Sequence, residues 1–248
     1  MRVLPILFNI EMVRAILDGR KMVTRRLVKV PPYYPHFYKL HDNTDGAITG
    51  TKDRLFAGFY KNEQIFYIDG KKHIDAVYYK APYQPGDILY VRETWCKNYY
   101  HDYGKYFYRA DGEEIDMPLI TGGTIKYGKA DGLRWRPYIH MPKEAARIWL
   151  KVTDVRVERL QEITQAEVVK EGAYEDCREC LESYGESGTQ CCYKQDDECS
   201  QCDSVIMEFE RLWNSTIKKS NLDRYGWDAN PWVWVIAFER CEKPEEKK

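Results

Sequence analysis

The sequence predicts a mixed α+β fold, and three features of the chain support this prediction. Stretches of strand character at residues 3–9, 88–94, 148–160 and 231–239 are separated by segments of helical spacing. Hydrophobic residues make up 44% of the chain and aromatic residues 14%, which is enough for a packed core and argues against a largely disordered protein. A polar, cysteine-rich segment interrupts this pattern near the C-terminal end, so we expect an inserted element there.

The N-terminal segment predicts a strand followed by a short helix. Residues 3–9 form an apolar run of strand length, and residues 11–18 place Val13 and Ile16 on one helical face. Gly19 stands where this helix should end, because the left-handed residue that closes a helix is easiest to form without a Cβ.

Residues 20–30 are polar and basic, although they lie between a predicted helix and a predicted strand. The basic residues of this stretch are Arg20, Lys21, Arg25, Arg26 and Lys29. Composition alone favours a solvated basic loop or a plain edge strand. In a regular strand Lys21 and Thr24 would point to opposite faces, so a bulge or a turn is needed for them to meet.

The middle of the chain predicts hairpins, loops and one buried strand. Residues 31–84 are rich in Tyr, Lys, Asp and Gly and show no sustained period. The Pro85-Gly86-Asp87 turn precedes the strand at 88–94, and residues 104–109 are expected to be its hairpin partner.

The second half of the chain carries the clearest local signals. We expect a helical turn at 142–147, a half-buried strand at 148–160, a helix at 165–171, a second helix at 204–213 and a terminal strand at 231–239. Thr164 and Glu167 have the spacing of a capping box, and Gly172 should close the helix that they begin.

The overall charge excludes binding that depends on a strong bulk field. The chain has 38 Lys and Arg against 39 Asp and Glu, so attraction to nucleic acid or to acidic membranes must come from local clusters. No apolar stretch approaches the roughly 20 residues of a membrane helix, and residues 1–30 lack the pattern of a signal peptide. We therefore expect a cytoplasmic protein with no membrane partner.

The cysteines predict a structural zinc site. Two C-x2-C pairs have the spacing of a zinc ribbon, namely Cys177, Cys180, Cys199 and Cys202. Each pair can supply two thiolates to one tetrahedral ion, whereas a polar loop of free thiols has little apolar content to order it. Cys191 and Cys192 are secondary candidates, and Cys96 and Cys241 are expected to be simply buried. No glycine-rich phosphate loop is present, so we expect no organic cofactor.

Two aromatic clusters are candidates for stacking a base. Arg92, Glu93 and Trp95 follow the central strand, where a ring beside a charged pair could stack a base and bind its edge. Trp227 and Asn230 belong to a second cluster before the terminal strand. Core packing explains the tryptophans equally well.

Four segments of the chain resemble the ASCH family, which has a PUA-like barrel. They are the Gly19-x-Lys21-x-x-Thr24-x-Arg26 stretch after its helix, the turn and strand at 85–89, the helix at 163–172 and the closing strand. The resemblance covers about half of the chain and looks closest to the long prophage-encoded members. It implies a small mixed β-barrel with flanking short helices, a single domain over 1–248, and insertions at about 31–84 and 173–203.

At the Lys-x-x-Thr motif the chain is similar to the members that hydrolyse N4-acetylcytidine. The usual family signature has Glu where this sequence has Thr24, and the hydrolases pair Lys and Thr three residues apart with a Glu on the later helix. The resemblance therefore implies Lys21, Thr24 and Glu171 as catalytic residues. A threonine hydroxyl needs a base to become a nucleophile, Lys21 would be that base, and Glu171 would orient it or shuttle the proton.

The resulting expectation is a pocket that recognises a modified nucleobase or nucleoside, or RNA, with hydrolysis of an N4-acyl amide as the candidate reaction. Arg20 and Arg26 join the aromatic clusters as substrate-binding candidates, although Arg26 could instead pair with Glu93. One alternative is a non-catalytic module that binds RNA or single-stranded DNA, which salt-dependent affinity would reveal. Another is a zinc-stabilised interaction protein of phage origin, whose partner binding would be lost on chelation.

Overall fold

The computed structural model describes residues 2–30, 36–42, 44, 54–68, 71–97, 106–112, 117–121, 124–128, 135–172 and 204–245. Contacts divide the chain into two compact units. Unit 1 comprises residues 1–21, 86–151 and 239–248, and unit 2 comprises residues 22–85 and 152–238. Each unit is therefore assembled from stretches that are distant in the sequence.

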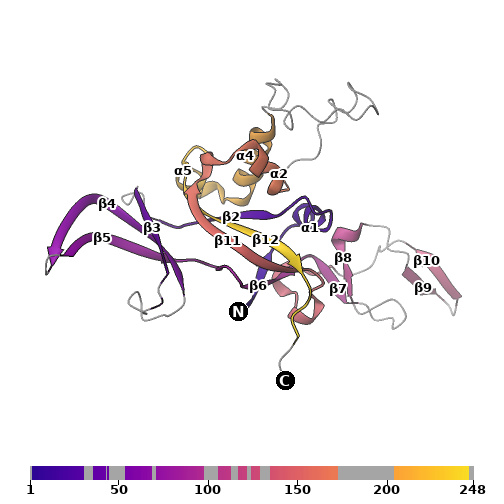
Figure 1. Ribbon diagram of the computed structural model, residues 1–248. Helices are drawn as coiled ribbons and strands as arrows, with labels where there is room; N and C mark the ends of the chain where they lie inside the picture. The colour runs from indigo at the N-terminus through magenta and orange to yellow at the C-terminus, as the bar shows by residue number, and fades with distance from the viewer. Residues whose placement is uncertain are drawn as a thin grey trace, which may run out of the picture. The chain divides into compact units, whose positions relative to one another are not determined.

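A five-stranded mixed sheet is the main element of the fold (Figure 1). Its order is β1-β6-β11-β12-β2, and the strands are β1 (Val3–Leu7), β6 (Ile88–Arg92), β11 (Trp149–Arg159), β12 (Trp232–Cys241) and β2 (Val23–Leu27). β1 runs parallel to β6, whereas β6–β11 and β12–β2 are antiparallel. The predicted α+β class is confirmed, and in this order the described strands form an open sheet.

Unit 1 holds the parallel pair β1–β6 and several short elements. These are α1 (Ile10–Leu17), the strands β7 (Trp95–Lys97), β8 (Tyr106–Tyr108), β9 (Met117–Thr121) and β10 (Thr124–Gly128), and the 3-10 helices η2 (Arg109–Asp111), η3 (Tyr138–His140) and η4 (Lys143–Ala145). Asn9 caps α1 by accepting a hydrogen bond from the Met12 N–H. The predicted hairpin partner is wrong in one respect, because the strand within 104–109 pairs with β7 rather than with β6.

In unit 2, helices cover one face of β2 and β12. They are α2 (Gln165–Lys170), α4 (Ser204–Thr216) and α5 (Leu222–Tyr225), with the 3-10 helices η5 (Leu160–Glu162) and η8 (Lys219–Asn221). Val168, Phe209 and Trp213 pack against Val233 and Val235 in one apolar cluster. None of the helices in the described part of the chain is long and apolar enough to cross a membrane.

The helix α2 forms where its local sequence predicts it. Thr164 accepts a hydrogen bond from the Glu167 N–H, and the Glu167 carboxylate accepts one from the Thr164 N–H, which is the predicted capping box. Gly172 closes the helix with a φ of 72°, as Gly19 closes α1 with a φ of 77°.

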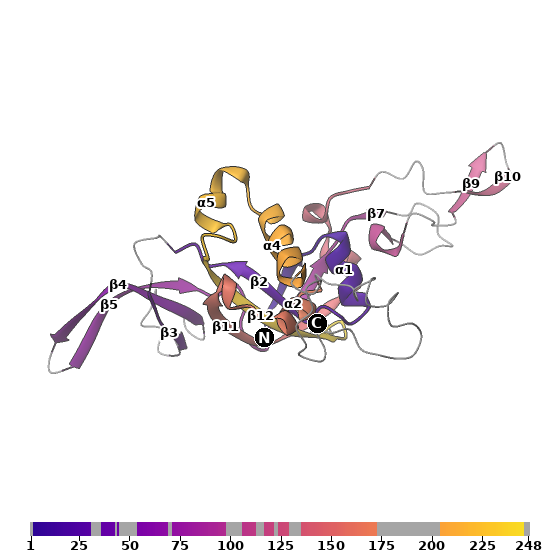
Figure 2. The ribbon, with the colours of Figure 1, turned by 90° about the horizontal axis from the view of Figure 1, so that it is seen from above.

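The region 31–84, predicted to form hairpins and loops, contains a three-stranded sheet in its described part. The strands β3 (His36–Asp42), β4 (Leu55–Ile68) and β5 (Lys71–Lys80) pair antiparallel in the order β3-β4-β5 (Figures 1 and 2). The buried ring of Phe59 lies 5.6 Å from that of Trp232 in β12 and 5.7 Å from that of Phe37. These aromatic contacts attach β3 and β4 to the rest of unit 2.

Candidate functional site

Lys21 lies in a sharp connection between α1 and β2. Gly19 ends the helix, and the Lys21 N–H donates to the Ala15 carbonyl oxygen at 2.9 Å, which folds the chain back on the helix. The residue is only 3% exposed, and its Nζ lies 5.4 Å from the centre of the Phe8 ring. Because lysine is rarely buried, this position differs from the solvated basic loop that composition favoured.

Thr24 and Arg25 point to opposite faces of the sheet, since they are neighbours in β2. Thr24 pairs with Ile236 of β12, and Arg25 pairs with Val235, which faces the helices. Both side chains are buried at 4% exposure. The strand therefore presents a hydroxyl on one face and a guanidinium on the other.

The Arg25 guanidinium is the centre of a buried ionic cluster on the helix side. It donates from Nη1 to Glu171 Oε1 at 3.1 Å and from Nη2 to Glu167 Oε2 at 3.1 Å, and it also binds Glu158. Glu171 is the C-cap residue of α2 and is 4% exposed. An ordinary last-turn glutamate would be solvated, so this carboxylate is held in place by the fold.

Arg156 completes the ionic cluster at its solvent edge. Its Nε donates to Glu158 Oε2 at 3.1 Å, and its Nη2 pairs with Glu167. Burial opposes ionisation of Glu167, but the Thr164 N–H and the charges of Arg25 and Arg156 outweigh it and lower its pKa. The cluster thus favours the charged form of Glu167.

Backbone hydrogen bonds join the start of β2 to the end of α2 within unit 2. The N–H of Met22, which follows Lys21, donates to the carbonyl oxygen of Lys170, which precedes Glu171, at 2.8 Å. The Phe238 N–H donates to the Met22 carbonyl oxygen at 2.9 Å. These bonds tie the start of β2 both to the C-terminal end of α2 and to β12.

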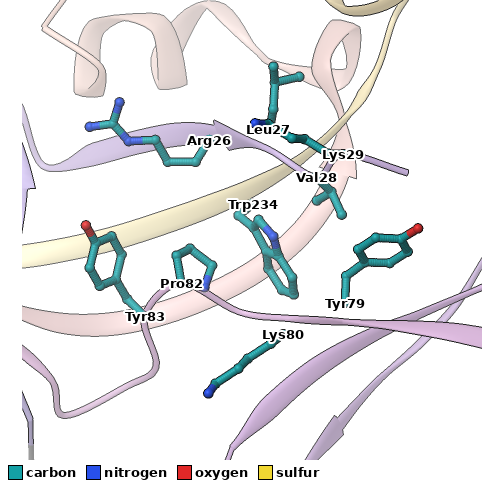
Figure 3. Close-up of a pocket in the computed structure, with 9 residues that line it drawn as sticks. All are labelled: Arg26, Leu27, Val28, Lys29, Tyr79, Lys80, Pro82, Tyr83 and Trp234. Atoms are coloured by element: carbon teal, nitrogen blue, oxygen red, sulfur yellow. The ribbon is translucent and has the colours of Figure 1, made fainter. Parts of the chain in front are cut away.

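Arg26 lies on the Thr24 face of β2 and lines a pocket of about 310 Å³ in unit 2 (Figure 3). Besides Arg26, its cationic side chains are Lys29 and Lys80, and its rings are Tyr79, Tyr83 and Trp234. Arg20, another substrate-binding candidate, is bound instead to Asp18 at 3.1 Å, with its side chain 30% exposed.

The predicted cluster of Arg92, Glu93 and Trp95 lies in unit 1 and is held by an arginine that the sequence analysis missed. Arg147 donates to both oxygens of Glu93, at 2.9 and 3.0 Å, and also pairs with Asp111. Burial raises the pKa of Glu93, and Arg147 offsets only part of the increase. The predicted carboxylate therefore has a structural partner on its own unit.

Arg92 and Trp95 carry buried donors next to this ion pair. Arg92 donates from Nη1 to the Ile139 carbonyl oxygen at 3.3 Å, and the Trp95 ring lies 5.5 Å from that of Tyr106. Among the described residues, neither Arg92 Nε nor Trp95 Nε1 has a hydrogen-bond partner. The aromatic packing agrees with a core role for Trp95, while both donors still need an acceptor.

Trp227 and Asn230 take structural positions at a turn of unit 2. The Trp227 ring packs edge-on against Phe209 at 6.2 Å, and its carbonyl oxygen accepts from Gln161 Nε2. Asn230 has a φ of 42°, and its Oδ1 accepts from the Gln161 N–H at 2.9 Å. These contacts fasten the turn before β12 to η5.

The predicted zinc ligands Cys177, Cys180, Cys199 and Cys202 lie outside the described residues, as do Cys191 and Cys192. Within the part of the chain that the structure describes, no group of three or more His, Cys, Asp and Glu side chains could hold a metal ion. Cys96 is buried as expected, and Cys241 is half-buried.

Sequence reasoning missed the residues whose role depends on distant pairing. Arg25 was counted among the basic residues of its stretch, yet its partner Glu171 is 146 positions away. Tyr79, Lys80 and Tyr83 surround a proline-rich turn and have no motif of their own. The alternation of β2 was the one available signal, because it separates Arg25 from Thr24 and Arg26.

Comparisons with protein-family models, with curated proteins and with solved structures find no match to this chain.

Proposed function

We propose that this protein recognises a modified cytosine nucleoside or nucleotide in a PUA-like scaffold and hydrolyses its N4-acyl amide. One observation carries the proposal: the three polar residues of the predicted catalytic set are all buried. Lys21 is 3% exposed, Thr24 4% and Glu171 4%. Burying three polar side chains costs free energy of folding. A catalytic role would explain why the fold retains them.

The proposed reaction has two steps that balance in atoms and protons. The Thr24 hydroxyl attacks the acyl carbon and passes its proton to the Lys21 amine. The C–N4 bond breaks, and the proton moves to N4, so that cytosine leaves as the amine and the acyl group stays as a threonine ester. Water then hydrolyses the ester and releases the carboxylic acid.

The surroundings of each residue support its proposed role. Lys21 is 3% exposed, as expected of a residue that lies inside a site rather than on the surface. The hydroxyl of Thr24 lies on the sheet face opposite Arg25 and its partner Glu171, so the role proposed for Glu171 is toward Lys21 and not toward Thr24. Glu171 is fixed by Arg25, which suits a positioning role toward the lysine.

The experiment is hydrolysis of N4-acetylcytidine and related N4-acyl nucleosides by purified protein, followed by separation of cytidine from substrate. We expect turnover by the natural protein and loss of at least about 100-fold in Lys21→Ala and Thr24→Ala. Lys21→Arg is the matched control for charge, because arginine keeps the cation but cannot act as a base. Full activity in Lys21→Arg, or no turnover of any substrate by folded protein, would refute the proposal.

The basic pocket favours a second candidate, a module that binds single-stranded RNA or DNA without cleaving it. Arg26, Lys29 and Lys80 could meet phosphates, and the rings could stack bases. This candidate predicts that the affinity for oligonucleotides falls as the salt concentration rises, and that the protein has no hydrolytic activity.

A further inference from the structure

The pocket of about 310 Å³ beside β2 has the chemistry of an anion site. Arg26, Lys29 and Lys80 contribute three positive charges, and none of the described residues that line it carries a carboxylate. The whole chain has a net charge of −1, so this excess of cations is local. A local concentration of one sign in a concave site attracts an anionic ligand.

The same pocket offers rings for a planar group. Tyr79 and Tyr83 line it together with Pro82, around the Trp234 ring at the centre of Figure 3, which is itself only 3% exposed. Aromatic faces stack on nucleobases of any sequence. The volume is at the lower end of the range for small-molecule sites, roughly 300–1,000 Å³, which suits a ligand of about one nucleotide.

The register of the sheet connects this pocket to Thr24. Arg26 lies opposite Trp234, and Thr24 lies opposite Ile236, so all four are on one face of β2 and β12. Two residues along a strand span about 7 Å. Thr24 is therefore a neighbour of Arg26 on this face, although it is buried and does not line the pocket.

We propose that this pocket binds the phosphate-bearing part of a nucleotide, and that the protein's ligand is a phosphorylated nucleotide rather than a free nucleoside. The nucleotide is either a free mononucleotide or one residue of an oligonucleotide, which share this chemistry. The link to Thr24 rests on the proposed function, whereas the binding of phosphate at the pocket does not.

The test is titration calorimetry of the full chain with cytidine 5′-monophosphate, cytidine, inorganic phosphate and a short single-stranded oligocytidylate. The monophosphate should bind at least about tenfold more tightly than cytidine, because a charge-assisted hydrogen bond contributes that much. If the natural ligand is an oligonucleotide, the oligocytidylate binds more tightly than the monophosphate. The logarithm of its association constant then falls with the logarithm of the salt concentration with a slope of about −2 for three phosphate contacts. Equal affinities for monophosphate and cytidine would overturn the proposal.

Exposed lysines give a variant that should keep its fold. Lys29→Gln/Lys80→Gln removes two exposed charges from the pocket and should weaken monophosphate binding about five- to tenfold, with cytidine unchanged. Lys219→Gln is the matched control, since it removes an exposed charge of unit 2 that does not line the pocket. An equal loss in the control would overturn the assignment.

The stacking role has its own pair of variants. Tyr83→Leu should weaken monophosphate binding about fivefold or more, whereas Tyr83→Phe keeps the ring and should bind within about twofold of the natural protein. If both variants bind alike, the ring does not stack on the ligand.

The outcomes separate this inference from the hydrolase. Phosphate-dependent binding without hydrolysis would retain the pocket and reject the reaction at Thr24. Hydrolysis of N4-acetylcytidine with no preference for its phosphorylated form would retain the reaction and reject the pocket.

Discussion

Replacement of Arg25 by methionine should strongly destabilise unit 2. The side chain of Arg25 is 1% exposed, and its removal leaves the carboxylate of Glu171, itself 6% exposed, without that charge partner. Breaking a buried ion pair from one side costs about 3–5 kcal/mol, because the remaining charge stays in a poorly solvated place. Glu158 and Glu167 still pair with Arg156 in this variant. We therefore expect a loss of unfolding free energy at the lower end of this range, about 3 kcal/mol.

Urea unfolding of the Arg25→Met protein measures this cost. The matched control is Arg156→Met, whose side chain is 37% exposed and whose loss should cost about 1 kcal/mol or less. The double variant Arg25→Met/Glu171→Gln should regain at least about 1 kcal/mol, since it also removes the buried charge that Arg25 binds. A loss below about 1 kcal/mol in Arg25→Met, or no recovery in the double variant, would refute the reasoning.

Four further predictions follow from local geometry and from the cysteines. The lowered pKa of Glu167 stabilises the fold above its ordinary value of 4.5, so the advantage of the natural protein over Glu167→Gln in urea unfolding should shrink as pH falls below about 4.5; a constant difference would contradict it. Burial, foremost among several causes, raises the pKa of Tyr108 from 10 to about 12, so the natural protein should lose stability relative to Tyr108→Phe as pH rises between those values, and parallel curves would contradict it. Gly226→Ala would place a Cβ 2.5 Å from the Leu222 carbonyl oxygen, so its melting temperature should fall while that of Gly226→Ser falls at least as far; an unchanged value would show that the turn moves freely. Elemental analysis should find one zinc per chain and markedly less in Cys180→Ser, and equal metal in both proteins would reject the proposed site.

Local signals made the elements that carry the proposed site predictable. The capping box at Thr164 and the glycine at 172 define α2 within a few residues, and both act through backbone groups close in sequence. The same holds for α1 and Gly19. The position of Glu171 at the end of its helix was therefore expected, but its burial was not.

Pairings between distant strands were not predictable in the same way. The strand at 88–92 lies beside β1 in parallel, although a hairpin with the next segment looked natural from the chain order. The long strands β4 and β5 carry charged and aromatic residues without clean alternation, so their sequence resembles loops. These strands are stabilised by their pairing with each other and by the packing of Phe59 on Trp232. Neither contact can be read from the local sequence pattern.

The burial of Thr24, a member of the proposed catalytic set, follows from the same distant contacts. Thr24 is buried because β2 pairs with the last strand, more than 200 positions later. A basic stretch is solvated in isolation, and only the completed sheet removes it from water.

The most direct test of the central claim compares Thr24→Val with Thr24→Ser in the hydrolysis of N4-acetylcytidine and its 5′-monophosphate. Valine keeps the shape of the buried side chain and removes the hydroxyl, whereas serine keeps a hydroxyl on the same atom. The account predicts that Thr24→Val is inactive and that Thr24→Ser retains measurable turnover. Turnover by Thr24→Val at the rate of the natural protein would contradict the assignment of Thr24 as the nucleophile.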